Sequence, residues 1–124
     1  MPGRNEIYSY QGPGSQQIER GKFSKLYFEE DTALLSKEEE AKLDEVTKFM
    51  ENNASAELLI VGFAHDNGTS EYNRVLGEQR AQTVRLRLIK SGCSESALQT
   101  LSFGAEESPK SGREARRVEL GIVR

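Results

Sequence analysis

Short apolar runs alternate along the chain with longer segments of helical period. Four of these runs have the pattern typical of β-strands, and they are 23–28 (FSKLYF), 57–63 (ELLIVGF), 98–103 (LQTLSF) and 117–123 (RVELGIV). The second run is apolar almost throughout, so we expect a central strand with both faces covered or partly shielded. In the last run Val118, Leu120 and Ile122 alternate with other residues, so we expect them to share one face.

The first segment of helical period begins at Ser36, which forms an S-x-x-E capping box with Glu39. Leu43, Val46 and Met50 follow at helical spacing, so we expect them on the buried face of this helix.

The second segment of helical period follows the polar stretch 62–73, and either Thr69 or Ser70 is expected to cap it. Its buried face is marked by Leu76, Ala81, Val84 and Leu88. We expect Gly92 just past its end, in the left-handed conformation that commonly terminates a helix.

The predicted order of elements is strand, helix, strand, helix, strand, strand. This order favours an α+β fold, a two-layer sandwich with both helices on one face of a mixed sheet. The length of 124 residues suits one domain. Residues 1–20 are rich in Gly, Pro, Ser and Gln and lack an apolar period. We therefore expect a flexible N-terminal tether or remnant over 1–20 and the folded domain over 21–124.

Composition narrows the classes of function. The net charge of −3 gives no reason to expect binding to nucleic acid. The apolar stretch Leu58–Val61 is far shorter than the roughly 20 residues of a membrane helix, so we expect no direct membrane insertion by this segment. The N-terminus of the sequence has no apolar core of the kind found in signal peptides. Cys93 is the one cysteine and cannot form an internal disulfide, so we expect a small, buried apolar role for it.

Catalytic and metal-binding patterns are weak in this sequence. His65 is the single histidine, and no nucleophile motif or Gly-rich phosphate loop accompanies it. His65 and Asp66 are adjacent, and a metal site needs further ligands. We therefore expect a protein that is not an enzyme and that uses no metal and no cofactor.

The junction between the second predicted strand and the second predicted helix is a better candidate for a binding site than for a catalytic or metal site. His65 and Asp66 lie there, and Asn73, Leu76 and Arg80 follow at spacings of three and four residues, which place them on one helix face. Arg80 therefore lies on or beside the buried stripe. It either forms an internal ion pair, for example with Asp66, or lines a cleft that holds a carboxylate in a bidentate grip.

These residues also resemble a known family. The family of OmpA C-terminal domains, which includes peptidoglycan-associated lipoproteins and flagellar stator proteins, has the loose pattern G-h-T/A-D-x-x-G-x-x-x-Y-N-x-x-L-S/G-x-x-R-A-x-x-V. This sequence matches it at Gly62, Gly68, Tyr72, Asn73, Leu76, Gly77, Arg80, Ala81 and Val84. LYFEEDTALL, with Asp31, resembles the opening strand of the family, SFGAEESP resembles its G-x-G-E-x-x-P turn, and ARRVEL, with Arg117, resembles its closing N-R-R-V-E strand. The resemblance covers about residues 23–124.

The resemblance implies a non-catalytic domain that binds peptidoglycan and anchors an envelope protein to the cell wall. Its place would be the periplasm or the periplasmic side of the outer membrane, with the signal or anchor outside this segment. In the family, an Asp after the second strand and the Arg of R-A grip diaminopimelate, a zwitterionic residue of the stem peptide. The ligand-binding residues implied here are Asp31, His65, Asp66, Asn73, Leu76, Arg80 and Arg117.

One departure from the family pattern bears on the ligand. Counted from Gly62 and back from Tyr72, the position of the family's Asp falls on His65 and not on Asp66. Ala115 also stands where the family has Asn. Two interpretations follow. In the first, the domain binds the stem peptide with weakened or altered preference, and its partners can include other envelope proteins. In the second, it is a degenerate member of the family that serves as a protein–protein interaction module in the envelope.

Overall fold

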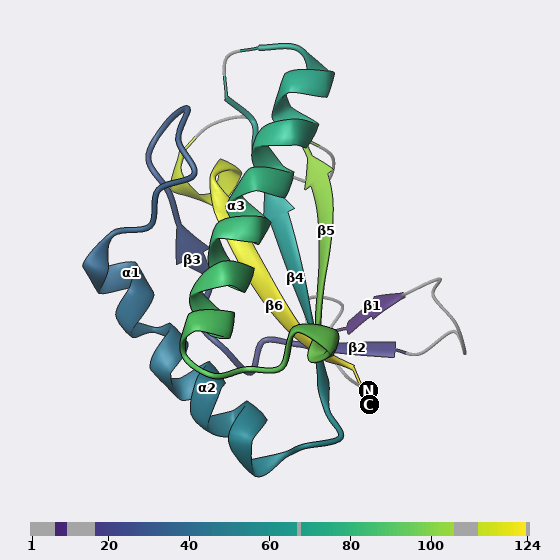
Figure 1. The fold of residues 1–124 in the computed structure, drawn as a ribbon. Coiled ribbons are helices and arrows are strands. Elements are labelled where there is room, and N and C mark those ends of the chain that lie inside the picture. Colours follow the sequence, from purple (N-terminus) through teal and green to yellow (C-terminus); the bar gives the residue numbers. More distant parts are fainter. Residues whose placement is uncertain (1–6, 10–16, 67, 106–111, 124) are drawn as a thin grey trace.

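The computed structural model describes residues 7–9, 17–66, 68–105 and 112–123 (Figure 1). The strands are β1 (Ile7–Ser9), β2 (Gln17–Arg20), β3 (Leu26–Tyr27), β4 (Glu57–Phe63), β5 (Leu98–Gly104) and β6 (Arg117–Val123). The helices are α1 (Lys37–Ala41), α2 (Leu43–Asn52) and α3 (Ser70–Lys90), with short 3-10 turns η2 (Glu95–Ala97) and η3 (Arg113–Ala115). The predicted α+β fold is confirmed.

The sheet is mixed and has the order β1-β2-β6-β4-β5, with β3 also paired to β6. β4 runs parallel to β5 and antiparallel to β6, so it is a central strand, as its continuous apolar sequence predicts. Leu58 and Ile60 belong to the main core, whereas Leu59 and Val61 belong to a second apolar cluster, so both faces of β4 are buried. Figure 1 shows α2 and α3 on the same side of this sheet.

The capping signals account for the starts of α1 and α3. The one helix predicted from Ser36 is divided at Lys42 into α1 and α2, and α2 begins without a side-chain cap. Ser36 accepts a hydrogen bond from the Glu39 N–H at the start of α1, which is one half of the predicted capping box. The Glu39 carboxylate accepts hydrogen bonds from the Tyr27 N–H and from Lys42. Thr69, and not Ser70, caps α3, because its hydroxyl accepts the N–H of Tyr72. Gly92 follows α3 with a φ of 107°. The residues predicted for the buried faces of the two helices are buried: Leu43, Val46, Met50, Leu76, Ala81, Val84 and Leu88.

The start of α3 packs very closely on the end of β4. A Cβ atom added at Gly62 would lie 1.8 Å from the carbonyl oxygen of Gly77, so the two backbones meet where no side chain fits between them. This contact positions the first turns of α3 beside the polar loop that follows β4.

The first predicted strand is shorter than the run 23–28. Only Leu26 and Tyr27 pair with β6, whereas Phe23 and Phe28 are buried in the core without belonging to a strand. The reason is that β2 occupies the other end of β6, and the chain turns away at Asp31, whose φ is 55°. Apolar residues that fill a core do not require strand pairing, and their pattern alone does not separate the two cases.

The N-terminal segment also differs from the expected tether over residues 17–20. These residues form β2, which pairs with β6, and Ile18 is fully buried. Gly121 leaves the space, because a Cβ added there would lie 2.2 Å from Ile18 Cγ2. A single isoleucine between polar neighbours produces no periodic signal, which is why composition misled the prediction here. Residues 1–6 and 10–16 lie outside the described part of the chain.

Candidate functional site

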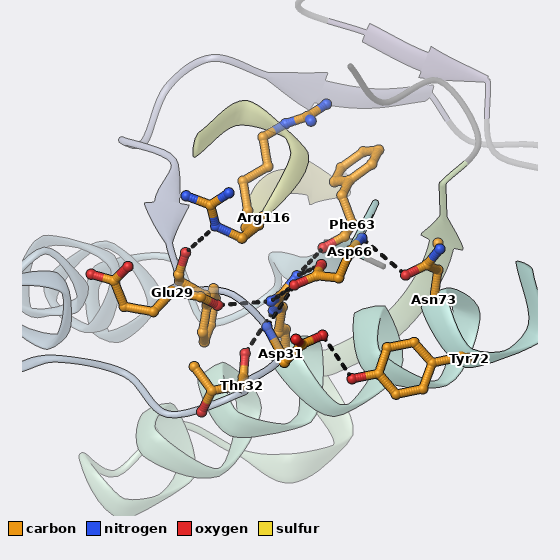
Figure 2. A network of polar contacts seen from close by, with 12 residues as sticks. Glu29, Asp31, Thr32, Phe63, Asp66, Tyr72, Asn73 and Arg116 are labelled. Atoms are coloured by element: carbon orange, nitrogen blue, oxygen red, sulfur yellow. Dashed lines mark hydrogen bonds and ion pairs between the residues drawn. The ribbon is translucent and has the colours of Figure 1, made fainter. Parts of the chain in front are cut away.

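The polar groups at the β4–α3 junction converge on the guanidinium of Arg80. Figure 2 labels its partners Glu29, Thr32, Phe63 and Asp66. Arg80 extends from α3 between the end of β4 and the loop 28–33, and its side chain is 0% exposed. Such a burial of a full positive charge requires that every donor be satisfied.

All five N–H groups of Arg80 are taken. Nε donates to the carbonyl of Thr32 at 2.8 Å. Nη1 donates to the carbonyl of Phe63 and to Oδ1 of Asp66, both at 3.2 Å. Nη2 donates to the carbonyl of Glu29 at 3.0 Å and to Oδ2 of Asp66 at 3.3 Å. A guanidinium has five donors in total, so Arg80 forms the internal ion pair and retains no donor for a ligand in this conformation.

Asp66 completes this network as the buried anion. Its side chain is 1% exposed and grips the Arg80 fork with both oxygens. Oδ2 also accepts the backbone N–H of Asp31 at 2.6 Å, and the backbone N–H of Asp66 donates to Oδ1 of Asn73 at 3.0 Å. The loop after β4 therefore turns so that Asp66 meets the arginine, whereas the sequence resemblance places the family's Asp at His65.

Asp31 joins the same network through its backbone and leaves its carboxylate near the surface. Oδ1 of Asp31 accepts the hydroxyl hydrogen of Tyr72 at 3.0 Å, as Figure 2 shows. This hydrogen bond to Asp31 raises the pKa of the Tyr72 phenol, with a smaller contribution from desolvation. The solvent-facing polar groups on this side of the network are thus an acid and a phenol.

The remaining predicted residues lie in different places. Asn73 and Leu76 are 3% and 4% exposed, so they support the loop and the core more than they line a surface. His65 is half-buried, and its backbone N–H donates to the carbonyl of Ala115 at 3.1 Å. Its imidazole forms no hydrogen bond with any described residue.

Arg117 is not part of the Arg80 network. It lies on the face of β6 opposite to Val118, stacks 3.8 Å from the ring centroid of Phe63, and pairs with Glu119 at 2.6 Å. Arg20 of β2 also pairs with Glu119, so this side chain helps to join β2 to the sheet. The structure therefore assigns Arg117 a packing position, and the resemblance alone had placed it among the ligand-binding residues.

Sequence reasoning missed the cavity next to this network. A cavity of about 310 Å³ lies between residues 27–29, residues 34–39 and η3, and Arg113 and Arg116 are among its lining residues. The lining residues come from two segments separated by more than 70 positions, and no local motif marks them.

Other site chemistry is limited in the described part of the chain. No group of three or more His, Cys, Asp or Glu residues there is arranged to hold a metal ion. Among the same residues, no helix combines the length and apolarity needed to cross a membrane. Cys93 is half-buried and packs against the main core, and burial raises the pKa of its thiol.

Comparisons with known proteins agree with this architecture. The peptidoglycan-associated lipoprotein of Pseudomonas putida is 35% identical over 101 residues, which are 77% of this chain and 60% of that protein. The crystal structure of the peptidoglycan-associated lipoprotein from Burkholderia pseudomallei has a TM-score of 0.74 at 28% identity and covers 79% of this chain and 88% of that one. The OmpA-like domain of FopA1 from Francisella tularensis shares the fold, with a TM-score of 0.76 at 21% identity over 96% of this chain and 81% of that one.

The family assignment follows from the match along the chain. The chain spans about 60% of the length of the curated Pseudomonas relatives. Residues 27–119 match the model of the OmpA family, and this range contains the Arg80 network, the adjoining cavity and Arg117. The chain therefore belongs to the OmpA family.

Proposed function

We propose that this domain binds peptidoglycan non-covalently, without catalysis, and anchors an envelope protein to the cell wall in the periplasm or on the periplasmic side of the outer membrane. The observation that carries the proposal is the family motif of β4 and α3 folded around a buried Arg80 network, in a chain 35% identical to a protein named peptidoglycan-associated lipoprotein. The ligand would be a stem peptide, whose diaminopimelate or equivalent residue presents an ammonium beside a carboxylate.

The geometry supports an altered ligand preference. A ligand carboxylate would have to displace Asp66 to reach Arg80, because the guanidinium has no free donor. A ligand ammonium would instead meet the carboxylate of Asp31, which is exposed beside Tyr72. We therefore expect weaker binding than in a member whose arginine is open to the ligand.

One observation favours a second candidate function, a protein-interaction module. Leu34, Val75 and Tyr72 expose 80%, 41% and 40% of their surfaces, and Val75 and Tyr72 lie on the first turns of α3 beside the closed Arg80 network. Exposed apolar and aromatic side chains are typical of surfaces that contact other proteins.

Sedimentation with purified sacculi tests the proposal. The domain should sediment with sacculi, and soluble muramyl peptides with a zwitterionic stem residue should compete, whereas peptides that lack this residue should not. Asp31→Asn should reduce the sedimented fraction, because it removes the charge offered to the ammonium. Glu30→Gln is the matched control, since Glu30 is an exposed neighbour that also loses one negative charge. A domain that stays in the supernatant would favour the protein-interaction module.

A further inference from the structure

The outer side of α3 carries an uncharged stripe. Val75, Gln79, Gln82 and Leu86 follow each other at spacings of four, three and four residues, which places them on one face of the helix. Val75, Gln79 and Leu86 are exposed, and Gln82 is half-buried. The opposite side of α3, which includes Arg80, is buried, and Figure 1 shows the helix lying along the sheet. The stripe is therefore separate from the Arg80 network.

Exposed apolar side chains gather around this stripe. Of the five large apolar or aromatic side chains that are exposed in the described part of the chain, three belong to α3, namely Tyr72, Val75 and Leu86. Leu34 is a fourth, and the carbonyl just before it accepts the hydroxyl hydrogen of Thr83 of α3 at 2.7 Å. Apolar groups that are concentrated on one face in this way indicate a contact surface for another protein.

Two side chains of opposite charge border the stripe on the side of β5. Oε1 of Glu78 accepts the hydroxyl hydrogen of Thr100 at 3.1 Å, and Nε of Arg85 donates to the carbonyl of Leu98 at 3.1 Å. Oε2 of Glu78 and Nη1 of Arg85 have no partner among the described residues. The hydrogen bonds to β5 already restrict both side chains, so a contact with another molecule requires little further ordering.

The stripe is complementary to itself. Its pattern is the same from either end, with an apolar residue at each end and two glutamines between them. When a second copy of α3 packs antiparallel, about a twofold axis between positions 80 and 81, Val75 of each copy faces Leu86 of the other. Gln79 then faces Gln82, and the two amides can exchange hydrogen bonds.

The bordering charges select this antiparallel arrangement. In the same register Glu78 of each copy faces Arg85 of the other, so the twofold axis produces two equivalent ion pairs. A parallel pair would set each charged residue at the height of its own copy, and Glu78 would meet no arginine. Charge complementarity therefore favours a second copy of this chain as the partner.

We propose that the domain forms a weak, symmetric dimer through the outer side of α3. This dimer gives the surface of the second candidate function a defined partner, and it does not require peptidoglycan. The stripe is about 16 Å long, from the rise of a helix over eleven residues. So short a contact belongs with the interfaces below about 1,200 Å², which are typical of transient complexes. Dimerisation should therefore depend on protein concentration.

The first test follows the ¹⁵N-labelled domain on dilution from millimolar to micromolar concentration. Backbone amides at 75–86 should shift with concentration, whereas those of β2 should not. The mass from sedimentation equilibrium should fall from dimer to monomer over the same range. A monomeric mass at every concentration, or shifts confined to other elements, would overturn the dimer and leave the stripe to a different protein.

The second test exchanges the charges. Glu78→Arg and Arg85→Glu each convert both ion pairs into repulsive pairs, so each variant alone should dimerise at least about tenfold more weakly than the unchanged domain. An equimolar mixture of the two should form a heterodimer, because the introduced charges then face each other and so do the native ones. Glu45→Arg is the matched control, since Glu45 is exposed on α2 and undergoes the same change of charge. It should dimerise like the unchanged domain.

Thermal melting checks that each variant folds. If Arg85→Glu does not fold, Arg85→Ala takes its place. Its mixture with Glu78→Arg keeps one ion pair and contains no repulsive pair, so the mixture should associate more tightly than Glu78→Arg alone. Variants that dimerise like the unchanged domain, or mixtures that recover no association, would contradict the proposed dimer.

Dimerisation and wall binding fail separately. A domain that sediments with sacculi and stays monomeric keeps the proposed function and loses the dimer. A domain that dimerises and does not sediment with sacculi keeps the dimer and loses wall anchoring.

Discussion

At the scale of single residues, the choice between His65 and Asp66 decides what Arg80 can do. The carboxylate of Asp66 has the Arg80 fork and the Asp31 N–H as partners, and Asn73 holds its backbone. A buried pair with this many hydrogen bonds is costly to break from one side, because the remaining charge stays buried. The network therefore links β4, α3 and the loop 28–33 and stabilises their arrangement.

Removing the Asp66 carboxylate from this network should destabilise the domain strongly. Asp66→Ala leaves Arg80 buried without its counterion, and we expect a loss of about 3–5 kcal/mol in the free energy of unfolding, measured in urea. Glu30→Ala is the control, since Glu30 is exposed, and it should change stability by less than about 0.5 kcal/mol. A loss below about 1 kcal/mol in Asp66→Ala would mean that water replaces the carboxylate and that the site opens easily.

Restoring an acid at the family position tests the ligand side. If the domain binds a stem peptide, His65→Asp should raise the affinity by about tenfold or more, because a full negative charge then faces the ligand ammonium. Isothermal titration with a diaminopimelate-containing muramyl peptide measures it, with His65→Asn as the neutral control. Weaker binding in His65→Asp would indicate that the imidazole itself contacts the ligand or that a second acid disturbs Asp66.

At the scale of elements, β2 is part of the folded domain. Ile18 is fully buried with Leu59, Val61, Phe63 and Val123, and Arg20 pairs with Glu119 of β6. The second face of the sheet is thus covered in part by a segment that composition alone assigns to a tether.

Shortening the side chain at position 18 measures the contribution of β2. Ile18→Ala should lower the free energy of unfolding by about 2–4 kcal/mol, because it removes buried methyl groups and leaves a cavity. Leu86→Ala is the control, since Leu86 is 61% exposed on α3. A loss in Ile18→Ala as small as in the control would return residues 17–20 to the role of a tether.

A hydrogen bond between β3 and η3 makes stability depend on pH at the alkaline end. Tyr27 donates to Oε2 of Glu114 at 2.6 Å. Burial and this bond raise the pKa of Tyr27 to about 12 from its ordinary 10.0. The folded state therefore keeps a proton that the unfolded chain releases, so the stabilisation is complete below pH 10 and is lost as the pH rises toward about 12.

Tyr27→Phe removes this proton linkage. Over pH 10–12 the wild type should lose stability more steeply than Tyr27→Phe, as measured by urea unfolding at several pH values. Parallel pH profiles of the two proteins over that window would contradict the linkage. On the acid side the same bond to Tyr27 lowers the pKa of Glu114, so its stabilisation should be lost as the pH falls below about 4.5.

At the scale of the whole molecule, the position of the site depends on how closely α3 approaches the sheet. Gly62 and Gly77 bring the backbones of β4 and α3 together, which places Arg80 over the end of β4. Any side chain at Gly62 would push the helix away and with it the guanidinium.

Gly62→Ala should therefore be more harmful than Gly77→Ala. The added Cβ at Gly62 lies 1.8 Å from a backbone oxygen, which cannot rotate away, whereas at Gly77 the nearest atom is the Ser102 hydroxyl at 2.5 Å, which can. We expect a loss of about 2 kcal/mol or more for Gly62→Ala and less for Gly77→Ala, by thermal or urea unfolding. The reverse order would show that α3 shifts more readily than the hydroxyl rotates.

Much of the architecture follows from signals that lie within a few residues of each other. Four local signals are confirmed: the Ser36 cap of α1, the apolar run of β4, the helical period of α3, and the alternation of Val118, Leu120 and Ile122. The junction of β4 and α3 was also located, because strand, loop and helix follow each other in the chain. The sequence by itself therefore determined the fold class, the strands β4, β5 and β6, the helix α3 and the place of the Arg80 site.

The occupants of that site were decided only by tertiary structure. Whether His65 or Asp66 meets Arg80 depends on the turn of the loop and on the Asp31 N–H, which lies 35 positions away in the chain. Ile18 became buried because Gly121 leaves room for it, and the cavity exists because η3 folds against residues 27–39. The physical reason is common to these cases: the free energy of a buried charge, a buried methyl group or a cavity depends on atoms contributed by distant segments, which no local period encodes.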